Sequence, residues 1–357
     1  MIAACSGGSA HAPMDMAMGP DLAKGPPPIG SALTVPNDQW TWVDFPDSSC
    51  DDGSTTGIGV YHSSTSSNLL VFMNGGGACW DYQTCYQLNT ASHGPFQQAE
   101  FAQFASASMA GTIFDRSEAQ NPFKDWSYVF IPYCTGDVHS GNNVIQYSMG
   151  TSTKTYHHTG HANVLAYLKR LQPTFPTPGK LVVSGSSAGG FGSLLNYATF
   201  RWYWPETKSY LLDDSGPPLE NDWIPQGFVM SWLTNWNLQA LLDDWCGDMC
   251  TTDLSYGVVV LTGAYPNDRM SLLSSLQDKT ISGYFLLSNT GMQAALTQLA
   301  TDRLDPTTNF HYFYVTGNTH TMLGDVASFT SNATPLWTWL GQQVNDDPAW
   351  ASTGKPQ

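Results

Sequence analysis

Positively charged residues are scarce in this sequence. The chain of 357 residues contains 13 lysines and arginines against 29 aspartates and glutamates, which gives a formal net charge of −16 at pH 7. No cluster of lysines and arginines offsets this balance locally. Because an acidic protein repels phosphate backbones and anionic membrane surfaces at long range, the composition argues against nucleic acids as partners.

Long apolar runs are also missing. No stretch reaches 18 consecutive apolar residues, so the sequence predicts no membrane-spanning helix. Hydrophobic residues nevertheless make up 41% of the chain and aromatic residues 13%, far from the composition of disordered proteins. Only 12% of the residues are charged, about half the usual share, and weakly charged chains are common among exported proteins. We therefore expect a globular protein with a large core.

The N-terminal segment has the composition of a leader and linker. Small residues precede Cys5, and a stretch rich in glycine, alanine, methionine and proline follows it. This arrangement is similar to the cleavage site of a bacterial lipoprotein, which would carry a lipid on Cys5. The other interpretation is an incidental cysteine in a disordered leader. In both cases residues 1–35 are expected to contribute nothing to the fold.

The remaining cysteines are even in number. They are Cys50, Cys79, Cys85, Cys134, Cys246 and Cys250. An even number in a chain expected to be exported indicates disulfides. Two pairs are close enough in sequence to close small loops, 79 with 85 and 246 with 250, which leaves 50 with 134. A zinc site is the alternative, but no histidine lies beside these cysteines at finger-like spacing.

Short apolar segments alternate with segments of helical periodicity after the linker. The expected strands are 68–74, 126–133, 180–185, 209–214, 256–265 and 310–317, and the expected helices are 161–171, 189–203 and 291–303. Strands that are apolar throughout and alternate with helices indicate a mostly parallel sheet covered on both faces. We therefore predict one α/β domain over residues 36–357, organised as a three-layer sandwich.

Reactive side chains follow the expected strands. The loops NGGGACWD, YCTGDVHSGN, GSSAGG, AYPND and GNTHTM each come directly after one of them. In parallel sheets the loops beyond the carboxyl ends of the strands meet at one edge, where functional residues gather.

The stretch KLVVSGSSAGGFG contains a candidate nucleophile. A nucleophile elbow has the pattern G-x-S-x-G, in which small residues on both sides of the serine permit a sharp turn from strand to helix. Ser187 has Gly185 and Gly189 in those places, whereas Ser186 has glycine in neither. The flanking strand and helix favour a nucleophile over a plain glycine-rich turn, and the spacing selects Ser187.

Two partners for this serine are expected later in the chain, because a serine hydroxyl needs a histidine to accept its proton and a carboxylate to orient the histidine. Hydrolases of the α/β type carry them in the order serine, acid, histidine. His320 directly follows the last expected strand and is the predicted base, since His311 lies inside that strand. Asp268 follows the preceding expected strand and is the predicted acid, with Asp214 as the second choice.

The glycine-rich loop 74–79 is the expected source of an oxyanion hole. Acyl transfer needs backbone N–H groups that stabilise the negative charge developing on the carbonyl oxygen. One donor is normally the residue after the nucleophile, here Ala188, and others come from a glycine-rich loop earlier in the chain. Gly76 and Gly77 suit that role, and a plain glycine turn is the weaker interpretation.

Together these motifs resemble the pectin acetylesterase family, which includes the Notum carboxylesterases. The resemblance rests on NGGGACWDYQTC at 74–85, IPYCTGDVHSGN at 131–142, GSSAGG at 185–190, and an aspartate followed by a histidine in the last third. It covers most of the chain after the linker. It implies an α/β-hydrolase fold with a mostly parallel central sheet.

The resemblance also implies roles for individual residues. It gives a catalytic triad of Ser187, Asp268 and His320, oxyanion donors at Gly76, Gly77 and Ala188, and a bridge between Cys79 and Cys85. Asp137 and His139 are expected near the substrate pocket, where they either shape it or only fix a structural loop. The sequence departs from the family at Ser186, where plant enzymes carry cysteine, and in the glycine loop at Gly77, where many members carry an aromatic residue.

The segment 216–250 is unusually aromatic. It contains Trp223, Phe228, Trp232 and Trp236, which fit either a lid over the substrate pocket or additional core. We favour a lid and expect Trp232 to line the pocket. Tryptophan suits stacking on a sugar, but it equally suits an acyl or aromatic group.

These expectations define a serine carboxylesterase that needs no metal and no organic cofactor. The leading hypothesis is an enzyme that removes acetyl groups from O-acetylated, pectin-like polysaccharide through an acyl-enzyme. The alternatives are an esterase for lipidic or aromatic esters and, from a different class, an inactive hydrolase scaffold that binds carbohydrate. We expect a monomer that is exported to the bacterial surface or periplasm as a lipoprotein, or secreted.

Overall fold

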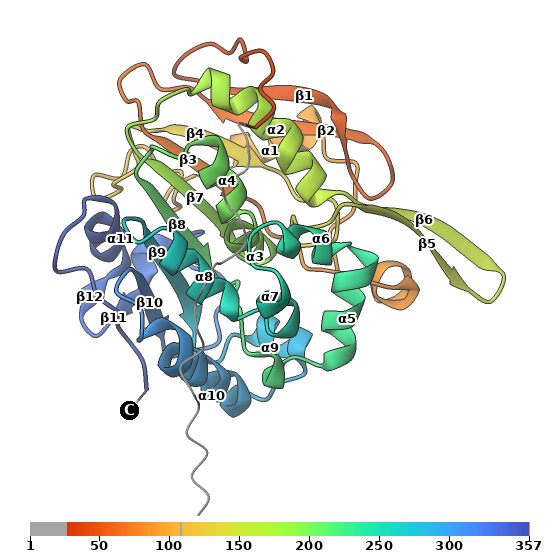
Figure 1. Ribbon diagram of the computed structural model, residues 1–357. Helices are drawn as coiled ribbons and strands as arrows, with labels where there is room; N and C mark the ends of the chain where they lie inside the picture. Colours follow the sequence, from red (N-terminus) through yellow and green to blue (C-terminus); the bar gives the residue numbers. More distant parts are fainter. Residues whose placement is uncertain (1–26, 108, 357) are drawn as a thin grey trace, which may run out of the picture.

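An eight-stranded sheet runs through the centre of the computed structural model, which describes residues 27–107 and 109–356 (Figure 1). The strand order is β1-β2-β4-β3-β7-β8-β9-β10. The six strands from β4 to β10 in this order are parallel, and β2 and β1 extend one edge in antiparallel fashion. The strands are β1 (Trp40–Ser49), β2 (Thr55–Tyr61), β3 (Leu69–Met73), β4 (Ser127–Ile131), β7 (Leu181–Ser186), β8 (Ser209–Asp214), β9 (Arg269–Ser275) and β10 (Phe310–Val315).

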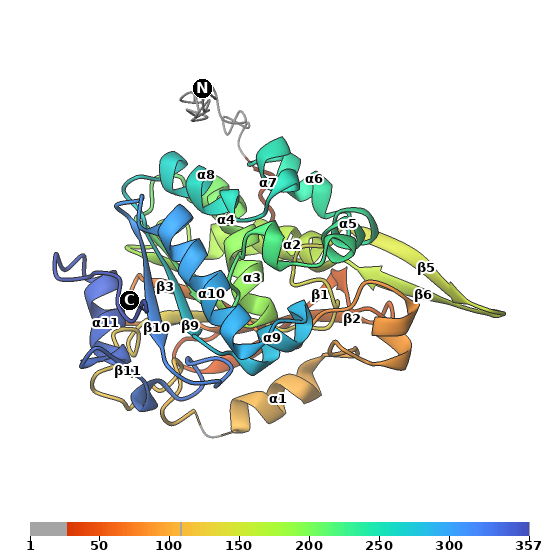
Figure 2. The same ribbon diagram turned by 90° about the horizontal axis from the view of Figure 1, so that it is seen from below.

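Helices cover both faces of the sheet, as Figure 2 shows. One face packs against α1 and α11 in one hydrophobic cluster, and the other packs against α2, α3, α4, α8 and α10 in a second, larger cluster. These helices are α1 (Gln98–Ser106), α2 (Gly160–Thr174), α3 (Ala188–Leu195), α4 (Tyr197–Tyr203), α8 (Tyr256–Ala264), α10 (Asn289–Leu299) and α11 (Leu336–Val344). The expected three-layer α/β sandwich is thereby confirmed.

The strands are apolar on both sides because each side faces a layer of helices. In β3, whose five residues are all buried, Leu69, Val71 and Met73 point into the larger cluster. Leu70 and Phe72 point into the cluster on the opposite face. This alternation follows from the two-residue period of a strand.

One expected strand is a helix. Residues 256–264 form α8, and the strand of this region is β9, which begins at Arg269. The run of valines in α8 looked like a buried strand, but its buried residues, Gly257, Val258, Leu261 and Thr262, recur with helical spacing. The serines in β9, with sequence RMSLLSS, hid the true strand.

Two segments extend beyond the three-layer sandwich. The hairpin of β5 (Asn143–Met149) and β6 (Ser152–His158) projects from the body, as Figures 1 and 2 both show. The segment expected as a lid folds into α5 (Gln226–Asn235), α6 (Leu238–Asp243) and α7 (Asp248–Thr252). After β9 comes α9 (Lys279–Phe285), and a two-stranded ribbon, β11 (Thr330–Ser331) with β12 (Thr334–Pro335), precedes α11.

All three expected disulfides are present. They join Cys50 to Cys134, Cys79 to Cys85, and Cys246 to Cys250. The first crosslinks residues that are 84 positions apart, from the end of β1 to the loop after β4. The second closes a small loop that directly follows the glycine-rich segment 74–79.

The packed part of the chain begins before residue 36, which corrects the expected linker boundary. The Gly30 amide donates to the Lys169 carbonyl at 2.8 Å, and the Leu33 amide donates to Thr174 Oγ1 at 2.7 Å. Leu33 itself is buried in the larger cluster because it packs beside α2. Cys5, the expected lipidation site, lies outside the described residues.

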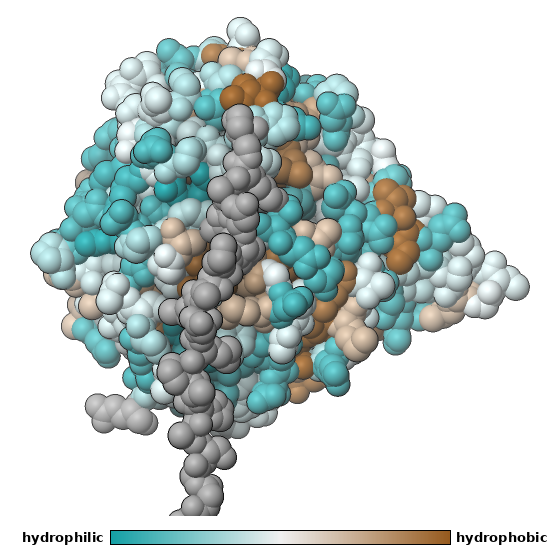
Figure 3. Space-filling model, viewed as in Figure 1, coloured by the Kyte–Doolittle hydropathy of each residue, from teal (hydrophilic) through white to brown (hydrophobic). Residues whose placement is uncertain are grey.

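One face of the molecule is mostly hydrophilic or intermediate in hydropathy. Figure 3 shows polar residues over most of one face, with apolar residues only in small groups. Across residues 27–107 and 109–356, none of the helices has the length and apolarity that a membrane span requires.

Candidate active site

Ser187 lies on a sharp turn between β7 and α3. Its backbone has φ 59° and ψ −121°, a conformation that ordinary residues avoid and that is typical of a strained functional turn. A Cβ on Gly185 would lie 2.2 Å from the Gly189 carbonyl oxygen, and a Cβ on Gly189 would lie 1.9 Å from the Met73 carbonyl oxygen. Both glycines of the G-x-S-x-G pattern are therefore required by close backbone packing around the serine.

His320 comes from the loop after β10, at the same edge of the sheet. Its Nδ1 lies 2.8 Å from Oδ2 of Asp278, which is completely buried. The other oxygen of Asp278 accepts hydrogen bonds from the amides of Thr280 and Ile281, so this residue also caps the N-terminus of α9.

The second ring nitrogen of His320 is unpaired within the described part of the chain. With a proton on Nδ1 donated to Asp278, Nε2 is left as an acceptor, which is the tautomer that a general base needs. Nε2 has no hydrogen-bond partner among the described residues, and His320 and Ser187 line the same cleft. The chain order is Ser187, Asp278, His320, which is the order of serine, acid and histidine in α/β hydrolases. All three follow the carboxyl ends of parallel strands, at one edge of the sheet.

Asp268, the predicted acid, lies elsewhere. It precedes β9, at the amino end of the strand, and is bonded to the Tyr197 hydroxyl at 3.0 Å with the Arg201 Nε at 2.8 Å from its Oδ2. Burial raises the pKa of Asp268, and the Arg201 charge opposes that rise. The structure thus corrects the prediction: because the expected strand 256–265 is helix α8, the aspartate after it lies at the wrong end of the real strand.

Asp214, the second choice for the acid, does not bond to the His320 ring either. It is fully buried at the end of β8, and its carboxylate accepts from the Ser186 hydroxyl at 2.7 Å. It also accepts from the amides of Met322 and Leu323 at 2.9 and 3.0 Å.

The glycine-rich loop lies directly against the nucleophile. A Cβ on Gly75 would come within 3.0 Å of the Ser187 Cβ. The amides of Gly76, Gly77 and Ala188 have no acceptor within the described part of the chain. These N–H groups are therefore available to an oxyanion bound beside Ser187.

Tyr284 fixes this loop from α9. Its hydroxyl accepts from the Ala78 amide at 3.2 Å and donates to the Thr90 carbonyl. Gly77 has φ +76°, and a Cβ there would meet both the Thr90 carbonyl and the Tyr284 hydroxyl. The seven-residue helix α9 thus connects the carboxylate at its N-cap to the oxyanion loop.

Asp137 and His139 lie behind the glycine loop and line neither the cavity nor the cleft beside Ser187. His139 donates through Nε2 to the Asn74 carbonyl at 2.8 Å, and burial lowers its pKa to about 4, which keeps it neutral. Asp137 accepts from the Thr135 hydroxyl at 2.6 Å and the Gly160 amide at 2.7 Å, and burial raises its pKa to about 6. Of the two expected roles, these contacts favour the second: His139 fixes the glycine-rich loop, and Asp137 accepts from the His139 amide behind it.

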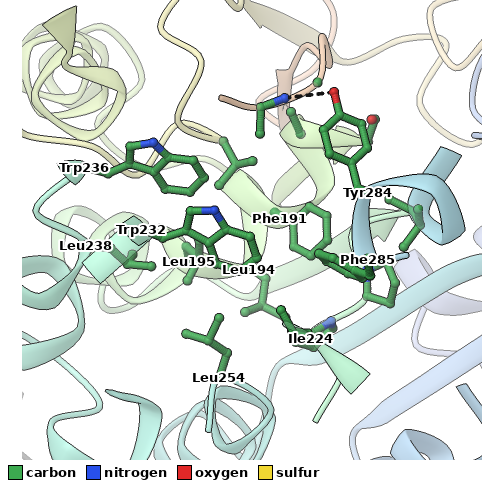
Figure 4. Close-up of a pocket in the computed structure, with 18 of the residues that line it drawn as sticks. Phe191, Leu194, Leu195, Ile224, Trp232, Trp236, Leu238, Leu254, Tyr284 and Phe285 are labelled. Atoms are coloured by element: carbon green, nitrogen blue, oxygen red, sulfur yellow. Dashed lines mark hydrogen bonds between the residues drawn. The ribbon is translucent and has the colours of Figure 1, made fainter. Parts of the chain in front are cut away.

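An apolar cavity opens beside Ser187. Its walls come from α3, the lid segment and α9, and Figure 4 shows Trp232 and Trp236 across from Phe285. The other labelled lining residues are Phe191, Leu194, Leu195, Ile224, Leu238, Leu254 and Tyr284. Trp232 stacks on Trp236 with ring centroids 5.5 Å apart, and Trp236 Nε1 donates to the Cys79 carbonyl at 2.9 Å. The lid segment is therefore both cavity wall and core, and Trp232 lines the cavity as expected.

A second, open cleft also borders Ser187. Its lining is polar and includes Asn74, Asn89, Thr90, Ser92, His93, Thr280, His320 and Thr321. Ser187, Gly77 and Tyr284 border both spaces. The serine therefore lies at the junction of an apolar cavity and a polar cleft.

Residues 40–238, more than half of the chain, match the family model described as pectinacetylesterase. The chain belongs to this family. Its members and their Notum relatives are carboxylic ester hydrolases.

Relatives that match the chain are palmitoleoyl-protein carboxylesterases. The planarian (Schmidtea mediterranea) protein NOTUM is 32% identical over 158 residues, which cover 43% of this chain and 29% of that protein. Human NOTUM is 30% identical over 152 residues, which cover 41% of this chain and 28% of that protein. The matched segment thus spans less than a third of these relatives.

The fold is similar to that of the Wnt deacylase Notum from Drosophila. One crystal structure of that protein matches with a TM-score of 0.59 and 18% identity, covering 85% of this chain and 93% of that one. At this identity the match supports the α/β-hydrolase-like fold alone.

Sequence reasoning missed Asp278 and Tyr284. Asp278 had a detectable signal, since an aspartate before Lys-Thr at the start of a helical segment is a typical N-cap. Tyr284 had none, because its partners Ala78 and Thr90 are about two hundred residues away in sequence.

Proposed function

We propose that this protein is a serine carboxylesterase that acts through an acyl-enzyme, with Ser187 as nucleophile, His320 as general base and Asp278 as the residue that orients His320. The hydrogen bond between His320 and Asp278 and the strained turn at Ser187 support this assignment. His320 takes the proton of Ser187 as the hydroxyl attacks the ester carbonyl, and gives that proton to the departing alcohol. Water then attacks the acyl carbonyl while His320 takes its proton, and His320 returns that proton to the Ser187 oxygen as the acyl–oxygen bond breaks and the acid is released.

The oxyanion formed in both steps is stabilised by the amides of Gly76, Gly77 and Ala188. One such donor contributes about 3–4 kcal/mol in a well-studied protease. The Asp278 carboxylate stabilises the imidazolium that forms on His320.

The acyl group that fits this site is longer than acetyl and apolar. The observation that carries this proposal is the cavity beside Ser187, whose walls are aliphatic and aromatic side chains from α3, the lid segment and α9. Apart from the Tyr284 hydroxyl and Trp232 Nε1, which has no hydrogen-bond partner among the described residues, these walls are apolar. They therefore suit the hydroxyls of a sugar poorly, whereas each buried methylene of an acyl chain contributes about 0.8 kcal/mol. The polar cleft that also borders Ser187 suits a hydroxyl-bearing alcohol as leaving group.

Removal of acetyl groups from polysaccharide is the second candidate. The match of residues 40–238 to the pectinacetylesterase model and the open, polar character of the cleft favour it. In that case the cavity would be left mostly empty by the substrate.

A series of p-nitrophenyl esters from acetate to dodecanoate separates the two candidates. We expect kcat/KM to rise about tenfold or more from acetate to hexanoate or octanoate, because each buried methylene adds binding energy. A maximum at acetate, together with acetate release from acetylated pectin or xylan, would favour the second candidate. Ser187→Ala should abolish turnover on every ester, and an active Ser187→Ala enzyme would rule out the nucleophile.

A pair of leucine variants tests the cavity itself. Leu254 lines the cavity away from Tyr284 (Figure 4), so Leu254→Trp should reduce kcat/KM for octanoate about tenfold and leave acetate within about twofold. The matched control is Leu88→Trp, since Leu88 is 60% exposed and lines neither the cavity nor the cleft. Equal chain-length profiles for the two variants would show that acyl chains do not enter the cavity.

Export of the protein is also proposed. Three disulfides are typical of proteins that fold in an oxidising compartment. A lipid on Cys5 would hold the enzyme at the bacterial surface or in the periplasm, and labelling with a radioactive fatty acid, compared between wild type and Cys5→Ala, tests that anchor.

A further inference from the structure

Ser186 and Asp214 are neighbours across two strands of the sheet. They are the last residues of β7 and β8, and the parallel register pairs them directly. The Ser186 hydroxyl donates to Asp214 Oδ2 at 2.7 Å, and the Asp214 carbonyl accepts from the Ser187 amide at 2.7 Å. Asp214 therefore holds the nucleophile turn through both its side chain and its backbone.

The same carboxylate holds the loop that carries His320. The amide of Met322 lies 2.9 Å from both oxygens of Asp214, and the amide of Leu323 lies 3.0 Å from Oδ2. These two residues are buried and follow His320 by two and three positions. Between them and His320, Thr321 adopts φ 65° and donates its amide to Ser215 Oγ at 3.2 Å.

The two sides of His320 are thus fixed by different carboxylates. Asp278 binds the ring, whereas Asp214 binds the backbone that follows it. Only Asp214 also contacts the nucleophile turn, since Asp278 bonds to α9 and His320. The contact between the serine turn and the histidine loop therefore runs through one buried side chain.

We propose that Ser186 and Asp214 are positioning residues that set the spacing between Ser187 and His320. This inference rests on the proposed function, because it assigns Ser187 and His320 as the reacting pair. Asp214 is buried and serves as a common acceptor, whereas Ser186 borders the cleft and aligns the Asp214 carboxylate. Ser186 occupies a position of the G-x-S-x-G pattern that any residue can fill. Its hydrogen bond to Asp214 gives the hydroxyl a role at that position.

The decisive variant is Ser186→Ala, which removes one hydrogen bond and leaves the buried charge of Asp214 with its backbone donors. Ser193→Ala is the control, since Ser193, which is buried whereas Ser186 is partly exposed, donates to the Gly190 carbonyl at 2.7 Å without reaching Asp214. Ser186→Thr keeps the hydroxyl on a residue that strands accommodate well. The readouts are kcat and KM on p-nitrophenyl butyrate and the rate of covalent labelling by a fluorophosphonate, which reacts with an activated serine whatever its natural substrate.

We expect Ser186→Ala to lower kcat and the labelling rate about tenfold while KM stays within about twofold, the size expected from one hydrogen bond to a charged group. Ser193→Ala should change both rates less than twofold, and Ser186→Thr should recover most of the loss. A Ser186→Ala protein that labels and turns over within twofold of wild type would overturn the proposal, as would an equal loss in Ser193→Ala.

Failure of this inference can be distinguished from failure of the proposed function. If wild-type protein does not react with the fluorophosphonate, Ser187 is not an activated nucleophile, and the proposed function fails with this inference. If wild type labels at Ser187 and Ser186→Ala labels equally fast, the proposed function stands and only the positioning role is refuted.

Discussion

Two buried aspartates flank β9, and their side-chain partners differ. Asp268, before the strand, is held by Arg201, Tyr197 and the Ser209 amide. Asp278, after the strand, is held by two helix amides and by His320. One carboxylate therefore satisfies a buried arginine, whereas the other orients a histidine that faces a cleft.

This difference suits a division of roles between the two ends of the parallel strands, with a structural carboxylate at the amino end of β9 and a carboxylate beside the candidate site after its carboxyl end. At the amino end of β9, the Asp268 carboxylate bonds to buried groups of the core. At the carboxyl end, Asp278 meets loops that carry Ser187, the glycine segment and His320, because parallel strands bring all their following loops to one edge. The predictions below test whether this division holds.

The largest effect is expected for Asp278→Asn. The amide cannot hold the Nδ1–H tautomer of His320 in the way a carboxylate does, and loss of the corresponding carboxylate lowers kcat about 10⁴-fold in a well-studied serine protease. We expect a comparable fall in kcat/KM on a short-chain p-nitrophenyl ester, with a folded protein by circular dichroism. A loss below about tenfold would show that another carboxylate orients His320.

The second effect should appear in stability and not in catalysis. Asp268→Asn leaves the Arg201 guanidinium, which is 8% exposed, without its ionic partner, and breaking a buried pair costs about 3–5 kcal/mol. Urea denaturation should show this loss, while kcat per folded molecule remains within about twofold of wild type. A large fall in kcat at full stability would contradict the division between the two ends of β9.

The third effect is a pH dependence of the free energy of unfolding, and it comes from His139, which supports the glycine-rich loop. His139 has a folded pKa of about 4, below the 6.5 of an exposed histidine, so unfolding takes up a proton at mildly acidic pH. Its contribution is present above pH 6.5 and is lost as pH falls toward 4, by about 2–3 kcal/mol at pH 4.5.

Urea denaturation of wild type and His139→Gln at pH 7 and pH 4.5 measures that contribution. The variant should lose less stability than wild type between the two values. Buried His158, whose pKa is lowered to about 3, changes in the same direction, and Asp137, whose pKa is raised to about 6, changes in the opposite direction; both are common to the two proteins and cancel in the comparison. An equal pH dependence would refute a buried, neutral His139.

The smallest effect is expected at Tyr284. Tyr284→Phe removes the hydroxyl that bonds to both the Ala78 amide and the Thr90 carbonyl, while the direct bond between these two groups at 3.2 Å remains, so the glycine-rich loop should lose alignment without leaving its place. We expect kcat to fall about tenfold with KM nearly unchanged, the size of one hydrogen bond. A change confined to KM would assign Tyr284 to substrate binding in the cavity or cleft that it borders.

The sequence predicted those parts of the site that depend on local pattern. Ser187 follows from glycine spacing, because the close packing at Gly185 and Gly189 excludes any side chain. His320 follows from its place after an apolar strand. The disulfide pairing follows from the even number of cysteines and from the short sequence separations within two of the pairs.

The remaining parts depend on long-range packing. Asp278 does not follow from the sequence, because the valine-rich run 256–264 resembles a strand more than the serine-rich β9 does. Taking that run as the strand places the predicted acid at residue 268, which lies before the real strand instead of after it. The cavity combines α3, the lid segment and α9, which no spacing rule connects. Asp137 and His139 have the residue types of a pocket, and only their burial behind Asn74 shows that they support a loop instead.

The most direct test of this account compares fluorophosphonate labelling of Asp278→Asn and Asp268→Asn at equal concentrations of folded protein, with the modified residue identified by mass spectrometry. We expect the label on Ser187 in wild type, a rate at least about 10³-fold lower in Asp278→Asn, and a rate within about twofold of wild type in Asp268→Asn. Labelling that survives in Asp278→Asn and is lost in Asp268→Asn would contradict the assignment of the acid and, with it, the separation of the two ends of β9.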